Sequence, residues 1–210
     1  MSRDWLSDDR ADLAAERILD AAAALFAERG VTAVGMGDIA KAAGCSRATL
    51  YRYFENRQAV RLAFVHRETR RIAAHVVHQV RDIADPGERI VAAMLAAVHE
   101  VRAEPLLIAW FRPGEAGAAG RISQDSEVIE SIAAGLFTPT DLTDPERSRL
   151  ARWLTRIIVS LLSAPGRDDA EERAMLDEFV APIISRAFAR VTDPGPKRAG
   201  MTGGVVETAG

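Results

Sequence analysis

Apolar side chains recur every three to four residues along most of this 210-residue chain, which is the spacing of an α-helix. The most regular runs are residues 150–162 and 176–188. The sequence shows no sustained alternation rich in β-branched residues, the pattern that marks a strand. Alanine is the most common residue and arginine far outnumbers lysine, and both favour helices. The sequence therefore predicts an all-α fold.

Glycines and polar caps divide the chain into separate helices. Gly30 and Gly44 are typical helix stops, and Ser46 and Asn56 are typical N-caps. The helices that these signals predict lie at about 10–29, 36–43, 47–53, 57–83, 86–102, a short stretch from 105, 124–136, a helix started by Asp144-Pro145 that carries the 150–162 stripe, and 176–188.

Basic residues gather in one window of the chain. Residues 41–71 hold eight basic and two acidic side chains, a net charge of +6, whereas the whole chain carries −3. A basic window on an acidic body is expected of a local contact with a polyanion. On charge alone, a solvated helical face is the simpler interpretation, so the motifs inside the window decide.

Two short helices joined by a tight turn at Gly44 overlap this window, and they form a helix-turn-helix pattern. On the second helix, Leu50 and Phe54 point together toward a core. The opposite side mixes small, hydroxyl, guanidinium and phenol groups and has no carboxylate. These outward residues are Ala48, Thr49 and Arg52, flanked by Tyr51 and Tyr53.

This outward surface suits the major groove of DNA. Arg52 can donate two hydrogen bonds to a guanine edge, Thr49 can read a base edge, and Ala48 permits close approach. Arg47 lies at the helix tip, where a base or a phosphate is within its reach. Backbone phosphates would be held by Tyr51, Tyr53 and Arg57. The alternative is a packed helical hairpin with incidental arginines.

The same region contains Gly30, Asp38-Ile39-Ala40, Ala43-Gly44, the nine residues from Ser46 to Phe54, and Arg57. Together these residues resemble the N-terminal domain of the TetR family of bacterial transcription regulators, with a dense match over 11–64. The resemblance implies about nine helices, a homodimer and a C-terminal effector-binding domain. It also implies DNA contacts at Arg47, Ala48, Thr49, Tyr51, Tyr53 and Arg57.

Residues 34–37 depart from the pattern of that family, which places hydroxyl residues just before the second helix. Here the sequence is Val34-Gly35-Met36-Gly37. Glycine is an acceptable cap, but the hydroxyl is lost and Gly37 weakens the helix. Two interpretations remain: a softer phosphate contact, or a contact through backbone amides at the helix N-terminus. We therefore include Gly35 among the DNA-binding candidates.

These expectations divide the chain into three parts. Residues 1–56 are expected to form the helix-turn-helix domain and 57–192 the ligand-binding and dimerisation domain, with 193–210 a disordered tail. The helix at 57–83 would act as a lever that changes the spacing of two DNA-reading heads. The function expected is that of a sequence-specific DNA-binding transcriptional regulator, a repressor released by a small-molecule effector.

By the resemblance, the effector pocket lies in residues 60–140. The candidates to line it are large apolar residues and one histidine, although each alone is more often a core residue: Phe64, Met94, His99, Leu107, Trp110 and Phe111. This mixture favours an apolar or aromatic effector.

A symmetric four-helix interface would use the stripes of the last two helices. Its candidates are Trp153, Ile157, Leu161, Phe179, Ile183 and Phe188. The same stripes can also pack onto their own subunit, and one helix can do both.

Other classes of function lack their motifs. The sequence contains no G-x-S-x-G elbow and no phosphate-binding glycine loop, so we expect no enzyme and no cofactor. His75 and His78 lie three apart without further ligands at metal-binding spacing, so we expect no metal site.

The single cysteine, the short apolar runs and the polar N-terminus predict a cytoplasmic protein without export signal, disulfide or membrane contact. One alternative function stays open, namely a helical ligand-binding or protein-interaction module that does not read DNA.

Overall fold

The computed structural model describes residues 5–111, 126–137 and 142–192, and every regular element in these ranges is helical. The predicted all-α fold is confirmed. The expected tail at 193–210 lies outside the described residues. In the described part of the chain, no helix is both long enough and apolar enough to span a bilayer. The elements are α1 (Trp5–Arg29), α2 (Met36–Ala42), α3 (Arg47–Tyr53), α4 (Arg57–Val80), α5 (Pro86–Ala103), α6 (Pro105–Ile108), the 3₁₀ turn η1 (Ala109–Phe111), α8 (Glu127–Phe137), α9 (Asp144–Ser163), α10 (Asp169–Phe179) and α11 (Ala181–Thr192).

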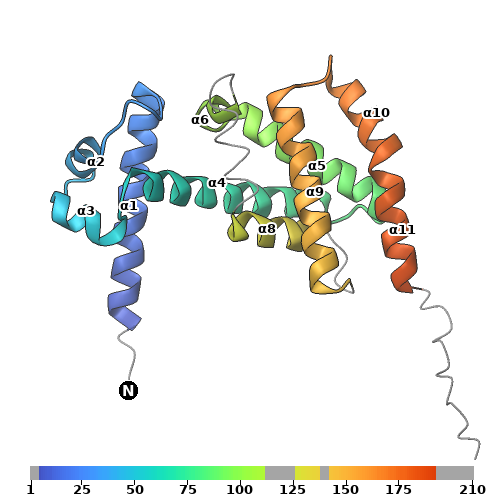
Figure 1. The fold of residues 1–210 in the computed structure, drawn as a ribbon, viewed down its shortest axis with the longest axis horizontal. Coiled ribbons are helices and arrows are strands. Elements are labelled where there is room, and N and C mark those ends of the chain that lie inside the picture. The colour runs from blue at the N-terminus through green and yellow to red at the C-terminus, as the bar shows by residue number, and fades with distance from the viewer. Residues whose placement is uncertain (1–4, 112–125, 138–141, 193–210) are drawn as a thin grey trace, which may run out of the picture.

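Helices α1, α2 and α3 form a small unit at one end of the molecule, with α3 at its outer edge (Figure 1). Phe26, Ile39 and Leu50 meet in its core, and none of them is more than 2% exposed. Each comes from a different helix, so one apolar centre fixes all three.

The predicted N-caps form at the starts of α3 and α4. The hydroxyl of Ser46 accepts the backbone N–H of Thr49 at 3.0 Å, at the start of α3. The side chain of Asn56 accepts the N–H of Ala59 at 2.9 Å, at the start of α4. Both caps satisfy amides that have no partner within a helix.

Gly44 lies in the turn between α2 and α3 with φ +65°. An L-residue is disfavoured there, so Gly44→Ala should lower the free energy of unfolding by about 1 kcal/mol. Gly135 lies within α8 with open space around its Cα, so Gly135→Ala should raise stability by up to about 1 kcal/mol. Urea unfolding measures both. A gain in stability of Gly44→Ala would contradict the left-handed turn, and a loss in Gly135→Ala would contradict the open space beside α8.

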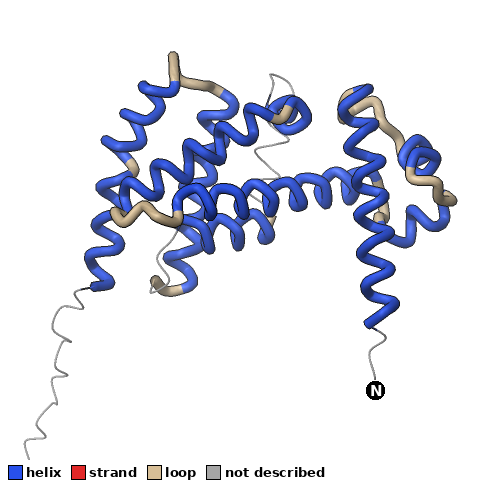
Figure 2. Tube along the Cα trace, turned by 180° about the vertical axis from the view of Figure 1, so that it is seen from behind, coloured by secondary structure: helices blue, strands red, loops and turns tan. Residues whose placement is uncertain are grey.

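Helix α4 is shared by the two parts of the molecule. It leaves the α1–α3 unit and runs between α5 and α8, as both views show (Figures 1 and 2). Near its start, Phe64 packs edge-to-face on Phe26 of α1, with ring centroids 5.8 Å apart. Farther along, Ile72 and Val76 are buried in the larger helical part. A displacement of α4 in one part therefore reaches the other.

One expectation needs correction, because the continuous helix predicted at 176–188 is divided in two. Helix α10 ends at Phe179 and α11 begins at Ala181. The second residue of α11 is Pro182, which has no N–H and whose ring clashes with a carbonyl four residues earlier in a continuous helix. The chain therefore breaks before this proline.

Candidate functional site

Helix α3 presents its outer face to solvent. Arg47, Ala48, Tyr51 and Arg52 are exposed, and the exposed fraction of Tyr51 is 50%. Leu50 is fully buried on the opposite side. The seven residues of α3 include no carboxylate. The exposed face thus offers two guanidinium groups and a phenol, which are groups that contact bases and phosphates.

Two of the predicted contact residues are also held by neighbours, one on α3 and the other at its N-cap. The guanidinium of Arg52 lies over the ring of half-buried Tyr53, 5.3 Å from its centroid. The hydroxyl of Thr49 lies 2.9 Å from that of Ser46, the N-cap. These contacts restrict the side chains before any partner arrives, which lowers the entropy lost on binding.

The α2 side of this surface differs from a hydroxyl-bearing helix start. Gly35 is the N-cap residue of α2, and its N–H donates to the Asp38 carboxylate at 3.0 Å, so this amide is engaged within the protein. A Cβ at Gly37 would lie 2.5 Å from Nη2 of Arg47. The Arg47 guanidinium therefore lies against the first turn of α2, and α3 supplies the cation on this side.

Arg57 lies at the first position of α4. Its Nη1 donates to the carbonyl oxygen of Thr32 at 3.0 Å, in the loop between α1 and α2. The side chain is exposed. This residue therefore ties the start of α4 to the α1–α3 unit and adds a positive charge beside the exposed face of α3.

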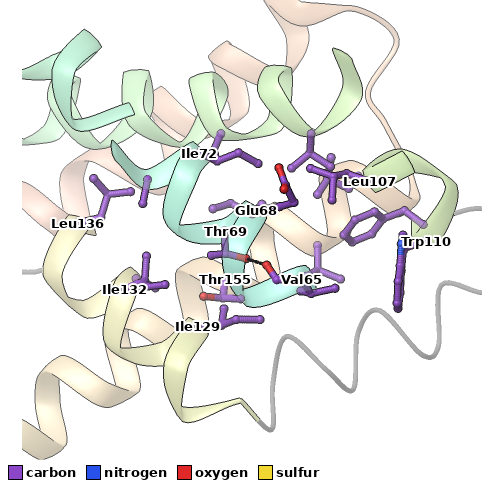
Figure 3. A pocket seen from close by; sticks show the side chains of 18 residues that line it. Val65, Glu68, Thr69, Ile72, Leu107, Trp110, Ile129, Ile132, Leu136 and Thr155 are labelled. Carbon is purple, nitrogen blue, oxygen red and sulfur yellow. Dashed lines mark hydrogen bonds between the residues drawn. The ribbon is translucent and has the colours of Figure 1, made fainter. Parts of the chain in front are cut away.

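A second feature is a partly open cavity of about 150 Å³ lined by residues of α4, α5, α6, η1, α8 and α9 (Figure 3). Its lining includes aliphatic and aromatic side chains from all of these elements: Val65, Ile72, Ala97, Leu107, Trp110, Phe111, Ile129, Ile132, Leu136, Ile158 and Leu162. The cavity thus lies where helices distant in sequence converge.

The hydroxyl groups in the cavity wall already have partners. Thr69 donates to the carbonyl of Val65 at 2.8 Å, and Thr155 donates to the carbonyl of Ala151 at 2.9 Å. The Glu68 carboxylate, also in the wall, accepts from Arg67 and Arg71. A molecule in the cavity would therefore meet mainly apolar groups. Such a surface favours an uncharged ligand, because a buried charge without a partner is costly.

Of the residues predicted to line a pocket, Leu107, Trp110 and Phe111 line this cavity. The other three lie elsewhere: Phe64 packs on α1, Met94 is fully buried in the core, and His99 is exposed on α5. Helical spacing cannot separate a core position from a cavity wall, because both faces are apolar. The lining residues of α4, α5, α8 and α9 were missed, and the 3,4 spacing of their apolar members was the one available signal.

His66 links α4 to the start of α8, and both of these helices contribute residues to the cavity wall. Its Nε2 lies 2.7 Å from the hydroxyl of Ser126, which also accepts the N–H of Ile129 at 3.3 Å. Burial, followed by the nearby Arg70 guanidinium, lowers the pKa of His66. The imidazole is therefore neutral at pH 7.

An apolar stripe runs along α10 and α11. Met175, Phe179 and Ile183 lie four residues apart and are 38%, 61% and 45% exposed. Phe179 and Ile183 were predicted interface residues, whereas Met175, one turn earlier at the same spacing, was not. Among the other candidates, Trp153, Ile157 and Phe188 are half-buried, and Leu161 is 7% exposed and packs within its own chain.

Comparison with known proteins identifies the family. Residues 18–64 match the family model described as bacterial regulatory proteins, tetR family. An uncharacterised HTH-type transcriptional regulator of Mycobacterium tuberculosis is 47% identical over 198 residues, which cover 92% of this chain and 98% of that relative. HTH-type transcriptional regulator AlkX of the same organism is 28% identical over 180 residues, covering 81% and 85%.

The fold has solved counterparts. The crystal structure of the TetR family repressor AlkX from Dietzia sp. superposes with a TM-score of 0.64 at 23% sequence identity, covering 81% of this chain and 95% of that one. The family model matches the α1–α4 region that carries the exposed face of α3, and the 47% identical relative extends over nearly the whole chain. The chain therefore belongs to the TetR family of bacterial regulatory proteins and is a helix-turn-helix transcriptional regulator.

Proposed function

We propose that this regulator is a homodimeric repressor that leaves its operator when an uncharged apolar molecule enters the cavity. The observation that carries the proposal is the position of α4. This helix begins beside the exposed face of α3, and five of its residues line the cavity: Val65, Glu68, Thr69, Ile72 and Ala73. A change at the cavity wall can therefore reach the DNA-reading unit through one rigid element.

The homodimer is supported by the exposed stripe of Met175, Phe179 and Ile183. These side chains lie on α10 and α11, at the opposite end of the molecule from α3 (Figure 1). One short helix offers little surface to DNA, and a dimer places two such helices on half-sites about one helical turn apart or more. Pairing along this stripe would bury the apolar side chains and leave both α3 helices free.

The apolar ligand is supported by the size and chemistry of the cavity. The cavity has a volume of about 150 Å³. An apolar cavity of about the same volume in another protein stays free of water and binds benzene. The Dietzia repressor AlkX is implicated in biodegradation of n-alkanes, which are uncharged and apolar. To cause release, the ligand must bind the DNA-incompetent arrangement more tightly than the competent one.

The test uses operator DNA selected by the protein from a random pool, with benzene as the probe of the cavity. Fluorescence anisotropy should show a Kd for DNA that rises steeply with salt, because Lys and Arg release counterions from phosphates. Saturating benzene should raise this Kd further. Ala133→Phe places a phenyl ring on the cavity wall and should abolish the benzene response.

Two results would contradict the proposal. A Kd that depends on neither salt nor sequence would remove the DNA-reading role. A benzene response that survives in Ala133→Phe would place the effector outside this cavity.

A further inference from the structure

Two adjacent residues in the middle of α4 connect the cavity wall with α1. Consecutive residues on a helix point about 100° apart. The side chain of Glu68 therefore contributes to the cavity wall, whereas that of Arg67 faces α1 (Figure 3 for Glu68). Among the described residues that line the cavity, Glu68 is the single charged one.

Arg67 holds two carboxylates of α1 at once. Its Nη1 donates to Asp20 at 2.7 Å and to Glu16 at 3.1 Å, which lie one helical turn apart. The guanidinium also lies over the ring of Phe64, 5.8 Å from the centroid, and the side chain is 22% exposed. Because both carboxylates are more than half exposed, these pairs add little to stability. They nevertheless form a direct polar link between α4 and two successive turns of α1.

Glu68 uses both carboxylate oxygens to hold arginines of its own helix. One oxygen accepts Nε of Arg67 at 3.3 Å, and the other accepts Nε of Arg71 at 2.8 Å. The side chain is 14% exposed, so few solvent positions are open to it. A ligand that displaces Glu68 from the cavity wall therefore displaces the acceptor that orients Arg67.

We infer that Glu68 and Arg67 transmit occupancy of the cavity to α1, where Glu16 and Asp20 receive it. Arg67 is a positioning residue: it is not among the residues that line the cavity, and it acts through its hydrogen bonds to α1. The inference rests on the proposed function, because it names the route by which a ligand alters DNA affinity.

A second route between the cavity and α1 exists and must be distinguished from the first. Helix α6 carries Leu107, which lines the cavity, and α6 packs against α1. This route is apolar and contains neither Arg67 nor its carboxylates. Removal of the Arg67 charge therefore separates the two routes.

The test compares Arg67→Met with Arg70→Met as its matched control. Arg70 is an exposed residue of the same helix, so both variants lose one positive charge and keep an unbranched side chain. Saturating benzene should weaken operator binding of the native protein and of Arg70→Met by the same factor, on the order of tenfold. In Arg67→Met the factor should fall below about twofold. Calorimetry should give similar Kd values for benzene in all three proteins.

A second variant approaches the network from α1 and does not depend on the stability of Arg67→Met. The double substitution E16Q/D20N keeps the side-chain shapes and removes both acceptor charges. It should reduce the benzene response to the same extent. Combining it with Arg67→Met should cause no further loss, because the substitutions break one interaction.

Each other outcome overturns a defined statement. A full benzene response in Arg67→Met and E16Q/D20N would overturn the inference and assign transmission to the α6 contact, while the proposed function would stand. Loss of the benzene response in Arg70→Met as well would overturn the inference, because it would show that removing any positive charge from α4 is sufficient. If benzene binds the native protein without changing its DNA affinity, the proposed ligand control is wrong and the inference falls with it.

Discussion

Replacing Arg102 with methionine should lower the free energy of unfolding by about 3 kcal/mol, because it leaves a buried carboxylate without its counter-charge. The Arg102 guanidinium donates to both oxygens of Glu172, at 2.7 and 2.9 Å, and Glu172 is 1% exposed. It also donates to the carbonyl of Leu161 at 3.0 Å, in the last turn of α9. The pair thus joins α5 to α9 and α10.

The control for this prediction is Arg173→Met, at an exposed position of α10, which should change stability by less than about 0.5 kcal/mol. The double variant R102M/E172Q should recover much of the loss, because a neutral amide has a smaller desolvation cost than a carboxylate. Urea unfolding at pH 7 measures all three. If Arg102→Met loses no more free energy of unfolding than Arg173→Met, Glu172 is not a buried, ionised carboxylate that depends on Arg102.

The same pair predicts how stability depends on pH. The hydrogen bond from Arg102 lowers the pKa of Glu172 in the folded protein. As the pH falls below the ordinary glutamate value of about 4.3, the unfolded chain takes up this proton more readily than the folded one. The stabilisation is therefore complete above that pH and is lost as the pH falls through the lowered pKa.

Arg52→Ala should cost about 1–3 kcal/mol of discrimination at one base pair of the operator, because we propose that Arg52 makes a bidentate contact with guanine. The guanidinium lies over the ring of Tyr53 and is therefore oriented before DNA arrives. Anisotropy titrations against the selected operator and its single-base variants measure the effect. The four bases at one operator position should bind with nearly equal affinity, while the base preferences at the other positions should not change.

The matched control is Arg57→Ala, which removes an equal charge at the start of α4. Its guanidinium donates to the carbonyl of Thr32, and we propose that it contacts phosphate in the complex. Binding should weaken by the same factor on operator and unrelated DNA, and the salt dependence should become shallower by about one ion. An equal loss of specificity in the two variants would mean that Arg52 does not read a base.

Features that depend on neighbouring residues could be predicted from the sequence. The caps at Ser46 and Asn56 each need one side chain and an amide three residues on, and both form as expected. The exposed face of α3 follows from helical geometry once Leu50 is assigned to the core. These interactions are local, so a linear pattern contains the information that determines them.

The cavity and the ion pairs could not be predicted in this way. Arg67 meets Glu16 across 51 positions of the chain, and Arg102 meets Glu172 across 70. No local period encodes such pairs, since they depend on how whole helices pack. The cavity is harder still, because it lies where side chains fail to fill the space between helices. Met94 lies on an apolar face like Leu107, yet only Leu107 lines the cavity.

The close approach of Arg47 to Gly37 has a consequence for redesign of the operator preference. Any side chain at Gly37 would place its Cβ 2.5 Å from a nitrogen of that guanidinium, so the arginine would have to move away from α2. Two positions on different helices are thus sterically dependent. Libraries that vary α3 alone would keep glycine at position 37 and the arginine orientation that it permits. Varying Gly37 together with α3 would add the other orientations.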